Sequence, residues 1–158
     1  VVDGGASPVG VESTIVACMD GHAQMLRPGG LTREAIEAVL GRALDAAPES
    51  PADRPLAPGL LASHYAPVAP VRLDAVDIRA GEAALLFGPQ HPVGLDQAVA
   101  AINLSPVGDL VEAAAALFSA LRQLDALAPT AIAVVPIPTF GLGEAIRDRL
   151  ARAAAPRG

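Results

Sequence analysis

Apolar residues recur at helical spacing in three stretches of the chain. A first helix is expected after Thr32, a good N-cap residue, and it should end at Gly41. A second helix should begin after Asp109 and a third at Gly141. The apolar stripes that predict them are Ile36, Val39 and Leu40; Leu110, Leu117, Leu121 and Leu124; and Leu142, Ile146 and Leu150.

Short β-branched or continuous apolar runs predict strands between these helices. The expected strands are residues 1–2, 13–18, 24–26, 71–76, 83–87 and 132–135. The last is a continuous apolar run of the kind found in buried parallel strands. Strands that alternate with helices over residues 69–155 predict an α/β fold with a Rossmann-like, mostly parallel sheet.

The pattern divides the chain into three parts. Residues 1–43 read as three strands and a helix, too little to enclose a core, so we expect them to be the terminal piece of an α/β domain whose remainder lies upstream. Residues 44–68 form a linker stiffened by prolines, although residues 60–67 are apolar enough to pack against something. Residues 69–155 form the small Rossmann-like domain.

Composition agrees with a folded, soluble chain. The 158 residues are 52% apolar, which is ample for a packed core. No apolar stretch approaches the roughly 20 residues that a membrane helix needs, and the first residues do not resemble a signal peptide, so a cytoplasmic location is expected. The single cysteine, Cys18, excludes an internal disulfide and is expected to be a small buried apolar residue.

The charged residues exclude some classes of function. All eleven basic residues are arginine, against 17 acidic residues, which gives a net charge of −6. With aromatics at only 3%, this balance argues against direct nucleic-acid binding. The absence of lysine excludes lysine-based chemistry within these residues, and one thiol without a histidine cluster makes no protein metal site.

Three short blocks carry candidate chemistry: residues 10–16 (GVESTIV), 26–29 (LRPG) and 58–67 (PGLLASHYAP). The hydroxyl of Ser13 can donate and accept hydrogen bonds, so it can bind a carboxylate or an amine. Arg27, held by the Pro-Gly turn that follows, offers a planar charged fork to phosphate oxygens. Tyr65 can stack on a nucleotide, or hydrogen-bond to it, while the linker closes over a pocket.

These blocks, in this order, resemble the C-terminal part of the two-domain threonylcarbamoyl-AMP synthases. Residues 104–110 and 141–150 resemble the C-terminal domain of the same family. The resemblance implies an enzyme that makes threonylcarbamoyl-adenylate from L-threonine, bicarbonate and ATP, with release of pyrophosphate, for tRNA modification. It implies that Ser13 contacts L-threonine and that Arg27 and Tyr65 contact ATP. ATP would be a substrate accompanied by magnesium.

The earlier half of the catalytic domain, with the basic residues that grip the triphosphate, would precede Val1 in such an enzyme. Adenylyl transfer depends on charge neutralisation around the phosphates, so we expect this chain to be inactive without that N-terminal half. Two other functions stay open: a non-catalytic regulatory or interaction module, and a free-standing nucleotide-binding protein.

Each candidate residue also has a structural interpretation. Ser13 fits a solvated strand face, Arg27 a surface ion pair with Glu12 or Asp20, and Tyr65 a packing anchor of the linker. Some features are expected to carry no chemistry. These are the adjacent Ser63 and His64, the two glycines at 141 and 143 that open a helix, and the acidic pairs Asp74/Asp77 and Glu34/Glu37, which we interpret as solvated charge.

Overall fold

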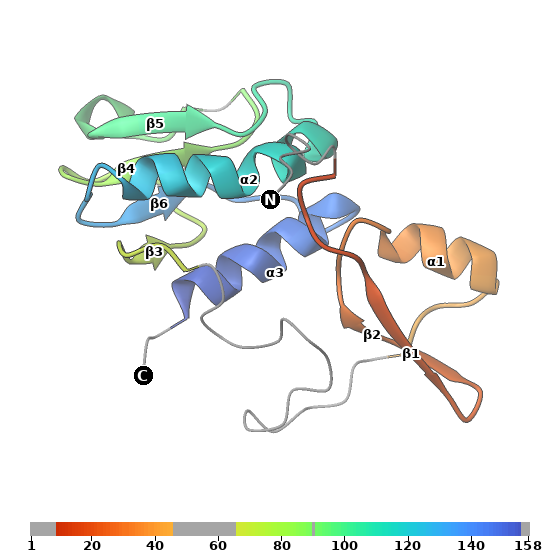
Figure 1. Ribbon diagram of the computed structural model, residues 1–158. Helices are drawn as coiled ribbons and strands as arrows, with labels where there is room; N and C mark the ends of the chain where they lie inside the picture. Colours follow the sequence, from red (N-terminus) through yellow and green to blue (C-terminus); the bar gives the residue numbers. More distant parts are fainter. Residues whose placement is uncertain (1–8, 46–65, 90, 156–158) are drawn as a thin grey trace, which may run out of the picture.

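The computed structural model describes residues 9–45, 66–89 and 91–155 (Figure 1). They form a mixed α/β fold with two sheets, one antiparallel with two strands and one parallel with four. The α/β class and the parallel sheet expected from the sequence are confirmed. Predictions that concern residues 1–8, 46–65, 90 and 156–158 lie outside the described residues; among them are the first strand, most of the linker and Tyr65.

The first sheet is a hairpin. Strand β1 (Ile15–Met19) pairs with β2 (His22–Arg27) through a turn at Asp20 and Gly21, whose φ angles of 52° and 79° suit an Asp-Gly hairpin turn. Helix α1 (Arg33–Leu40) follows. Among the described residues, the buried apolar cluster of this part consists of Ala23 and Met25 of β2 and Leu44.

The expected ends of α1 are confirmed. The hydroxyl of Thr32 accepts a hydrogen bond from the backbone N–H of Ala35 at 3.3 Å, and Gly41 ends the helix in the left-handed conformation. Helix α2 (Leu110–Asp125) is also capped as predicted, because the Asp109 carboxylate accepts from the N–H groups of Val111 and Glu112.

The parallel sheet has the order β3–β6–β4–β5, with β3 (Val71–Arg72) and β5 (Ala100–Asn103) at its edges. Its central strands, β4 (Ala83–Leu86) and β6 (Ile132–Val134), are buried at every position. They are therefore the continuous apolar runs that a fully covered strand requires.

Helices α2 and α3 (Leu142–Ala154) pack side by side on one face of this sheet (Figure 1). Of the apolar residues predicted to share a face on these two helices, Leu110 is only partly buried against the core, and the others are buried there: Leu117, Leu121, Leu124, Leu142, Ile146 and Leu150. The other face is covered by irregular chain and the short helix η1 (Leu95–Gln97), around a second apolar cluster of Ala75, Ile78, Ala84, Leu86, Ala133 and Val135.

Two details differ from the sequence prediction. The expected strand 71–76 is only two residues long, because Asp74 adopts a φ of 51° that extended backbone does not allow. Strand β5 and helix η1 were not predicted, since Ala-rich β5 has neither a β-branched run nor a clear alternation.

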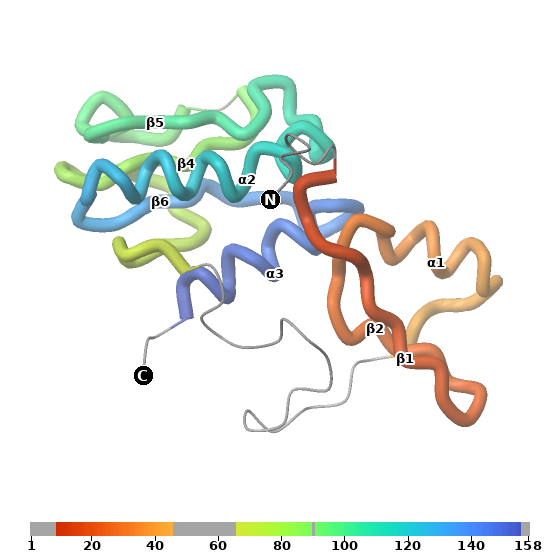
Figure 2. Tube along the Cα trace, viewed as in Figure 1, coloured from red at the N-terminus to blue at the C-terminus, as the bar shows by residue number. Residues whose placement is uncertain are grey.

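Helix α3 lies between the parallel sheet and the hairpin, and the segment 9–14 runs past the ends of α2 and α3 before it enters β1 (Figure 2). Gly10 is in direct contact with α2. It has a φ of 68°, and a Cβ atom there would lie 2.1 Å from the carbonyl oxygen of Ala114, so only glycine fits. Within the described ranges, none of the helices is long and apolar enough to cross a membrane.

Candidate functional site

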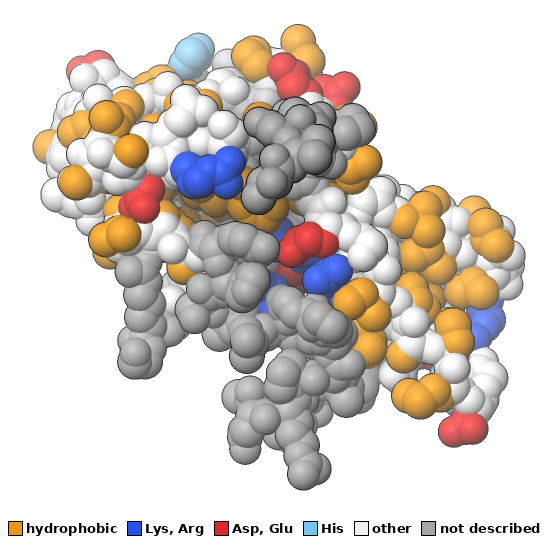
Figure 3. All heavy atoms as spheres, viewed as in Figure 1, with side chains coloured by type: hydrophobic (Ala, Val, Ile, Leu, Met, Phe, Trp, Pro, Cys, Tyr) orange, Lys and Arg blue, Asp and Glu red, His pale blue; other side chains and the backbone are white. Residues whose placement is uncertain are grey.

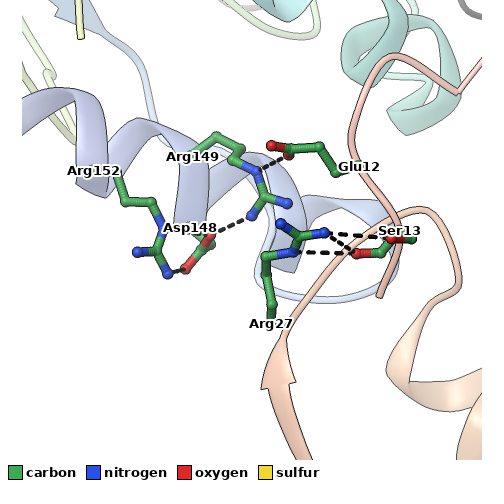
Figure 4. A network of polar contacts seen from close by, with 6 residues as sticks. All are labelled: Glu12, Ser13, Arg27, Asp148, Arg149 and Arg152. Atoms are coloured by element: carbon green, nitrogen blue, oxygen red, sulfur yellow. Dashed lines mark hydrogen bonds and ion pairs between the residues drawn. The ribbon is translucent and has the colours of Figure 1, made fainter. Parts of the chain in front are cut away.

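The structure brings Ser13 and Arg27 together. Antiparallel pairing sets Ile15 opposite Arg27, so the end of β2 lies beside the segment that precedes β1. The Arg27 guanidinium donates to the carbonyl oxygen of Ser13 from Nη2 at 2.9 Å and from Nε at 3.3 Å, and Nη2 lies 3.4 Å from the Ser13 hydroxyl (Figure 4). Arg27 is only 8% exposed, whereas Ser13 is exposed. Arg27 therefore does not occupy the surface position that a solvated ion pair would require.

The loop after Arg27 holds the same segment by its backbone. The N–H of Gly30 donates to the carbonyl of Glu12 at 2.9 Å. The hydroxyl of Thr14 donates to the carbonyl of Leu31 at 2.5 Å and accepts from the Leu31 N–H at 3.1 Å. At Gly29 a Cβ atom would lie 2.3 Å from the Glu12 carbonyl oxygen, so the Pro-Gly pair allows the two backbones to touch.

Glu12, the residue before Ser13, makes an ion pair with α3. Its Oε2 lies 2.6 Å from Nε of Arg149 (Figure 4). Arg149 is 6% exposed, and its guanidinium also contacts Asp148. Asp148 in turn pairs with Arg152, with Oδ1 and Nη2 2.9 Å apart. Burial alone would raise the pKa of Glu12, but the hydrogen bond and charge of Arg149, with the charge of Arg27 nearby, lower it below its ordinary value.

A second set of contacts joins α1 to the beginning of α3. Nη2 of Arg33 lies 2.6 Å from Oε1 of Glu144, and its Nε lies 3.1 Å from Oε2, a two-pronged pair. This hydrogen bond is the main reason that the pKa of Arg33 is raised. The Glu34 carboxylate accepts from the N–H of Gly141 at 3.1 Å, which lowers the pKa of Glu34.

The four carboxylates interpreted as solvated charge do remain exposed or partly exposed, but each also has a specific partner. Besides the Glu34 contact, Glu37 accepts from the N–H of Leu44 at 2.9 Å. Asp74 pairs with Arg147 at 2.8 Å and Asp77 with Arg72 at 3.1 Å. The spacing along the chain could not show these partners, because each one except Leu44 and Arg72 comes from a distant element.

The paired glycines at the beginning of α3 have a packing role. A Cβ atom at Gly143 would lie 2.1 Å from the carbonyl oxygen of Pro138, so this position requires glycine for close contact between α3 and the preceding loop. This agrees with the helix-start interpretation of that motif. Among the described residues, no group of three His, Cys, Asp or Glu side chains could hold a metal ion.

An apolar hollow of about 680 Å³ lies beside the site, between the segment 9–16 and α1. Its apolar lining is Val9, Val11, Val16, Leu31, Ile36 and Leu40. Cys18 also lines it. The prediction that Cys18 is buried was wrong, because its side chain is exposed. On the visible face, apolar side chains gather over the hairpin and α1 (Figure 3), and Met19 and Val39 are 67% and 88% exposed.

Sequence reasoning missed Glu12 and Arg149 as site residues. They are 137 positions apart, and no local motif marks their contact. The nearest signal was the Arg-rich end of α3. Tyr65, with Ser63 and His64, lies outside the described residues, so the structure unites two of the three predicted site residues.

Comparison with known proteins identifies the relatives of this chain. A family model described as threonylcarbamoyl-AMP synthase, C-terminal domain, matches residues 31–155. The chain is 33% identical to the threonylcarbamoyl-AMP synthase of Bacillus subtilis, over 99% of its own length and 49% of the relative's. It is 35% identical to that of Pyrococcus abyssi, over 97% and 48%. The chain thus spans about half the length of the curated relatives it matches.

Solved structures give the same result. The crystal structure of P. abyssi Sua5 complexed with L-threonine matches with a TM-score of 0.78 and 29% identity, over 96% of this chain and 48% of that one. A variant of P. abyssi Sua5 with an adjacent histidine and tyrosine both replaced by alanine matches with a TM-score of 0.72 and 25% identity, over 96% and 47%. On the family match and on this likeness of fold, the chain belongs to the threonylcarbamoyl-AMP synthase family.

Proposed function

We propose that this chain is the C-terminal portion of an enzyme that forms threonylcarbamoyl-AMP from L-threonine, bicarbonate and ATP and releases pyrophosphate, for tRNA modification. The family match supports the product, and the L-threonine complex of P. abyssi Sua5 supports one substrate. The observation that carries the proposal is the contact of Arg27 with Ser13, because it places a hydroxyl beside a permanent positive charge.

Ser13 would bind L-threonine. Its backbone carbonyl is held by Arg27, while its side chain is exposed, so a hydroxyl that can donate and accept is offered to a ligand from a fixed backbone. Arg27 would stabilise the phosphates of ATP, with magnesium accompanying the nucleotide. Because the two side chains touch, the amino acid and the nucleotide would be bound next to each other. The reaction requires this, since the carboxyl group from bicarbonate must link the threonine amine to the α-phosphate of ATP as pyrophosphate leaves.

Tyr65 would contact ATP from the linker. The P. abyssi variant, in which an adjacent histidine and tyrosine are replaced, shows that such a pair exists in a relative. Here the only tyrosine, Tyr65, directly follows His64. If the phenol hydroxyl contributes, Tyr65→Phe raises the KM for ATP; if the ring stacks, only Tyr65→Ala does so. Equal KM values for ATP in all three proteins would contradict any role of Tyr65 in binding the nucleotide.

The N-terminal half of the catalytic domain would be the partner of the apolar hollow beside β1. The relatives are about twice as long as the matched region, and the hollow is an apolar surface of the kind that another folded part covers. Such an enzyme would act in the cytoplasm without direct contact between this chain and nucleic acid, since the chain carries a net charge of −6.

The test measures pyrophosphate release with ATP, L-threonine and bicarbonate. We expect threonine-dependent release by the full-length enzyme that carries this chain and none by the 158 residues alone. Robust turnover by the 158 residues would contradict the need for an N-terminal half. Affinity for ATP in this chain alone, without turnover by the full-length enzyme, would instead favour a free-standing nucleotide-binding protein.

A further inference from the structure

We infer that the C-terminal α/β unit, residues 69–155, positions Ser13, the serine proposed to bind L-threonine. Arg149 is the positioning residue, and it acts through Glu12. The inference rests on the proposed role of Ser13. It adds that the binding site is completed by a helix near the end of the chain, although no residue of that helix needs to touch the substrate.

The contact between Glu12 and Arg149 is direct, and it is buried on the arginine side. Nε of Arg149 donates to Oε2 of Glu12 at 2.6 Å, and the two side chains are 5% and 36% exposed. Asp148 fixes the other side of the same guanidinium (Figure 4). Since Glu12 is covalently next to Ser13, this contact ties the backbone segment that carries the serine to α3.

In free energy, Arg149 is an unfavourable residue with which to join two parts of a protein. Among the described residues its Nη2 is buried and has no hydrogen-bond partner. A buried guanidinium with an unmade bond contributes less to stability than well-packed apolar residues of similar volume. A role in orienting Glu12 explains why a charged group is found at this point of the interface.

Helix α2 holds the same segment at a second point. Gly10 packs so closely on α2 that a Cβ atom would lie 2.1 Å from the carbonyl oxygen of Ala114. The C-terminal unit therefore contacts the segment 9–14 at Gly10 and at Glu12. Arg27, at the end of β2, and Gly30, in the loop that follows, hold the same segment from the other side. Ser13 lies immediately after these contacts, with its backbone fixed relative to both parts of the molecule.

The charges around Glu12 explain why losing Arg149 would disturb Ser13. Both Arg149 and Arg27 lower the pKa of Glu12, so its carboxylate lies within electrostatic reach of both guanidinium groups. Without Arg149, the carboxylate is left with Arg27 as its nearby cation, and a move towards Arg27 would compete with the Ser13 carbonyl for the same donors. Ser13 would then lose the contact that fixes its backbone.

The experiment uses the full-length enzyme with Arg149→Gln, Arg149→Lys and Glu12→Gln. The matched control is Arg147→Gln, on the same helix, which removes a two-pronged pair with Asp74 that involves neither Glu12 nor Ser13. We expect Arg149→Gln to raise the KM for L-threonine about tenfold, with little change in the KM for ATP. Arg149→Lys should recover part of the loss, because it keeps the charge. Arg147→Gln should lower Tm and leave the KM for L-threonine unchanged.

Equal effects of Arg149→Gln and Arg147→Gln on the KM for L-threonine, or an unchanged KM in Arg149→Gln, would overturn the inference. If Arg149→Gln does not fold, Glu12→Gln decides: Glu12 is partly exposed, and its substitution breaks the ion pair that ties the segment to α3 while leaving no unpaired carboxylate near Arg27, so a raised KM for L-threonine would come from the lost ion pair alone. A normal KM for L-threonine in Glu12→Gln would then overturn the inference. The absence of threonine-dependent pyrophosphate release in the unsubstituted enzyme would refute the proposed function instead, so the two failures are distinguishable.

Discussion

Arg27 holds Ser13 by its backbone, with Nη2 and Nε 2.9 Å and 3.3 Å from the same carbonyl oxygen. A lysine in place of Arg27 keeps the charge but cannot place two donors in one plane. We therefore expect Arg27→Lys to raise the KM for L-threonine as well as the KM for ATP, and to lower kcat/KM by about tenfold or more. Steady-state pyrophosphate release, with each substrate varied in turn, measures both values.

A residue that contacted only the nucleotide would behave differently. In that case Arg27→Lys would change the KM for ATP and leave the KM for L-threonine at its original value. Such a result would show that the hydrogen bonds to the Ser13 carbonyl do not matter for substrate binding.

Gly10 and Gly41 separate the effect of close packing from the effect of backbone conformation. Their φ angles are 68° and 67°, but only Gly10 has neighbours within the space that a Cβ atom would fill. Alanine in the left-handed conformation costs about 1–2 kcal/mol, so Gly41→Ala should destabilise the protein by about that amount. Gly10→Ala should cost clearly more, because α2 must move away. Urea unfolding of both variants compares the two, and equal losses would contradict the packing role.

The buried carboxylate of Glu82 predicts a loss of stability in acid. It accepts from Arg72 at 2.6 Å and 3.0 Å and from the N–H of Arg79 at 2.9 Å, and it is 5% exposed. The hydrogen bond with Arg72 outweighs burial and lowers the pKa of Glu82 below its ordinary value of 4.5. The stability that this ionised group contributes is therefore present above pH 4.5 and is lost as the pH falls from there through the lowered pKa.

Glu82→Gln should remove that part of the pH dependence and destabilise the protein by about 1.5–3 kcal/mol at neutral pH, because Arg72 loses its main charged hydrogen-bond partner. Thermal unfolding between pH 3 and pH 7 measures the difference. The gap between the variant and the original protein should narrow towards the acidic end, and parallel curves over the whole range would contradict the assignment.

The labelling rate of the exposed Cys18 thiol can show whether the apolar hollow is covered. Cys18 lines this hollow on β1, and the N-terminal half is proposed to cover it. A thiol reagent should therefore modify Cys18 readily in the 158-residue chain and at least about tenfold more slowly in the full-length enzyme, where the surface is covered. Mass spectrometry after timed labelling gives both rates. Equal rates would show that the N-terminal half does not cover this side of β1.

Local patterns predicted most of the fold. Thr32 and Asp109 cap helices as their side chains suggest, and the leucine stripe of α2 is buried because its spacing follows the helical period. Cys18 was misjudged because the expectation of burial assumes that both faces of a strand are covered. The contact between Glu12 and Arg149 could not be predicted, since it depends on how α3 packs beside the hairpin rather than on any neighbouring residue.

The long separation between Glu12 and Arg149 also sets an order of events during synthesis. A ribosome releases the hairpin long before α3 has been translated, and domains form from the N-terminus onward. Until that last helix emerges and docks, the serine next to Glu12 has only its contacts with the hairpin. A chain that stops before α3 would therefore lack the contact of Arg149 with Glu12, and the serine proposed to bind the amino acid would be held less firmly.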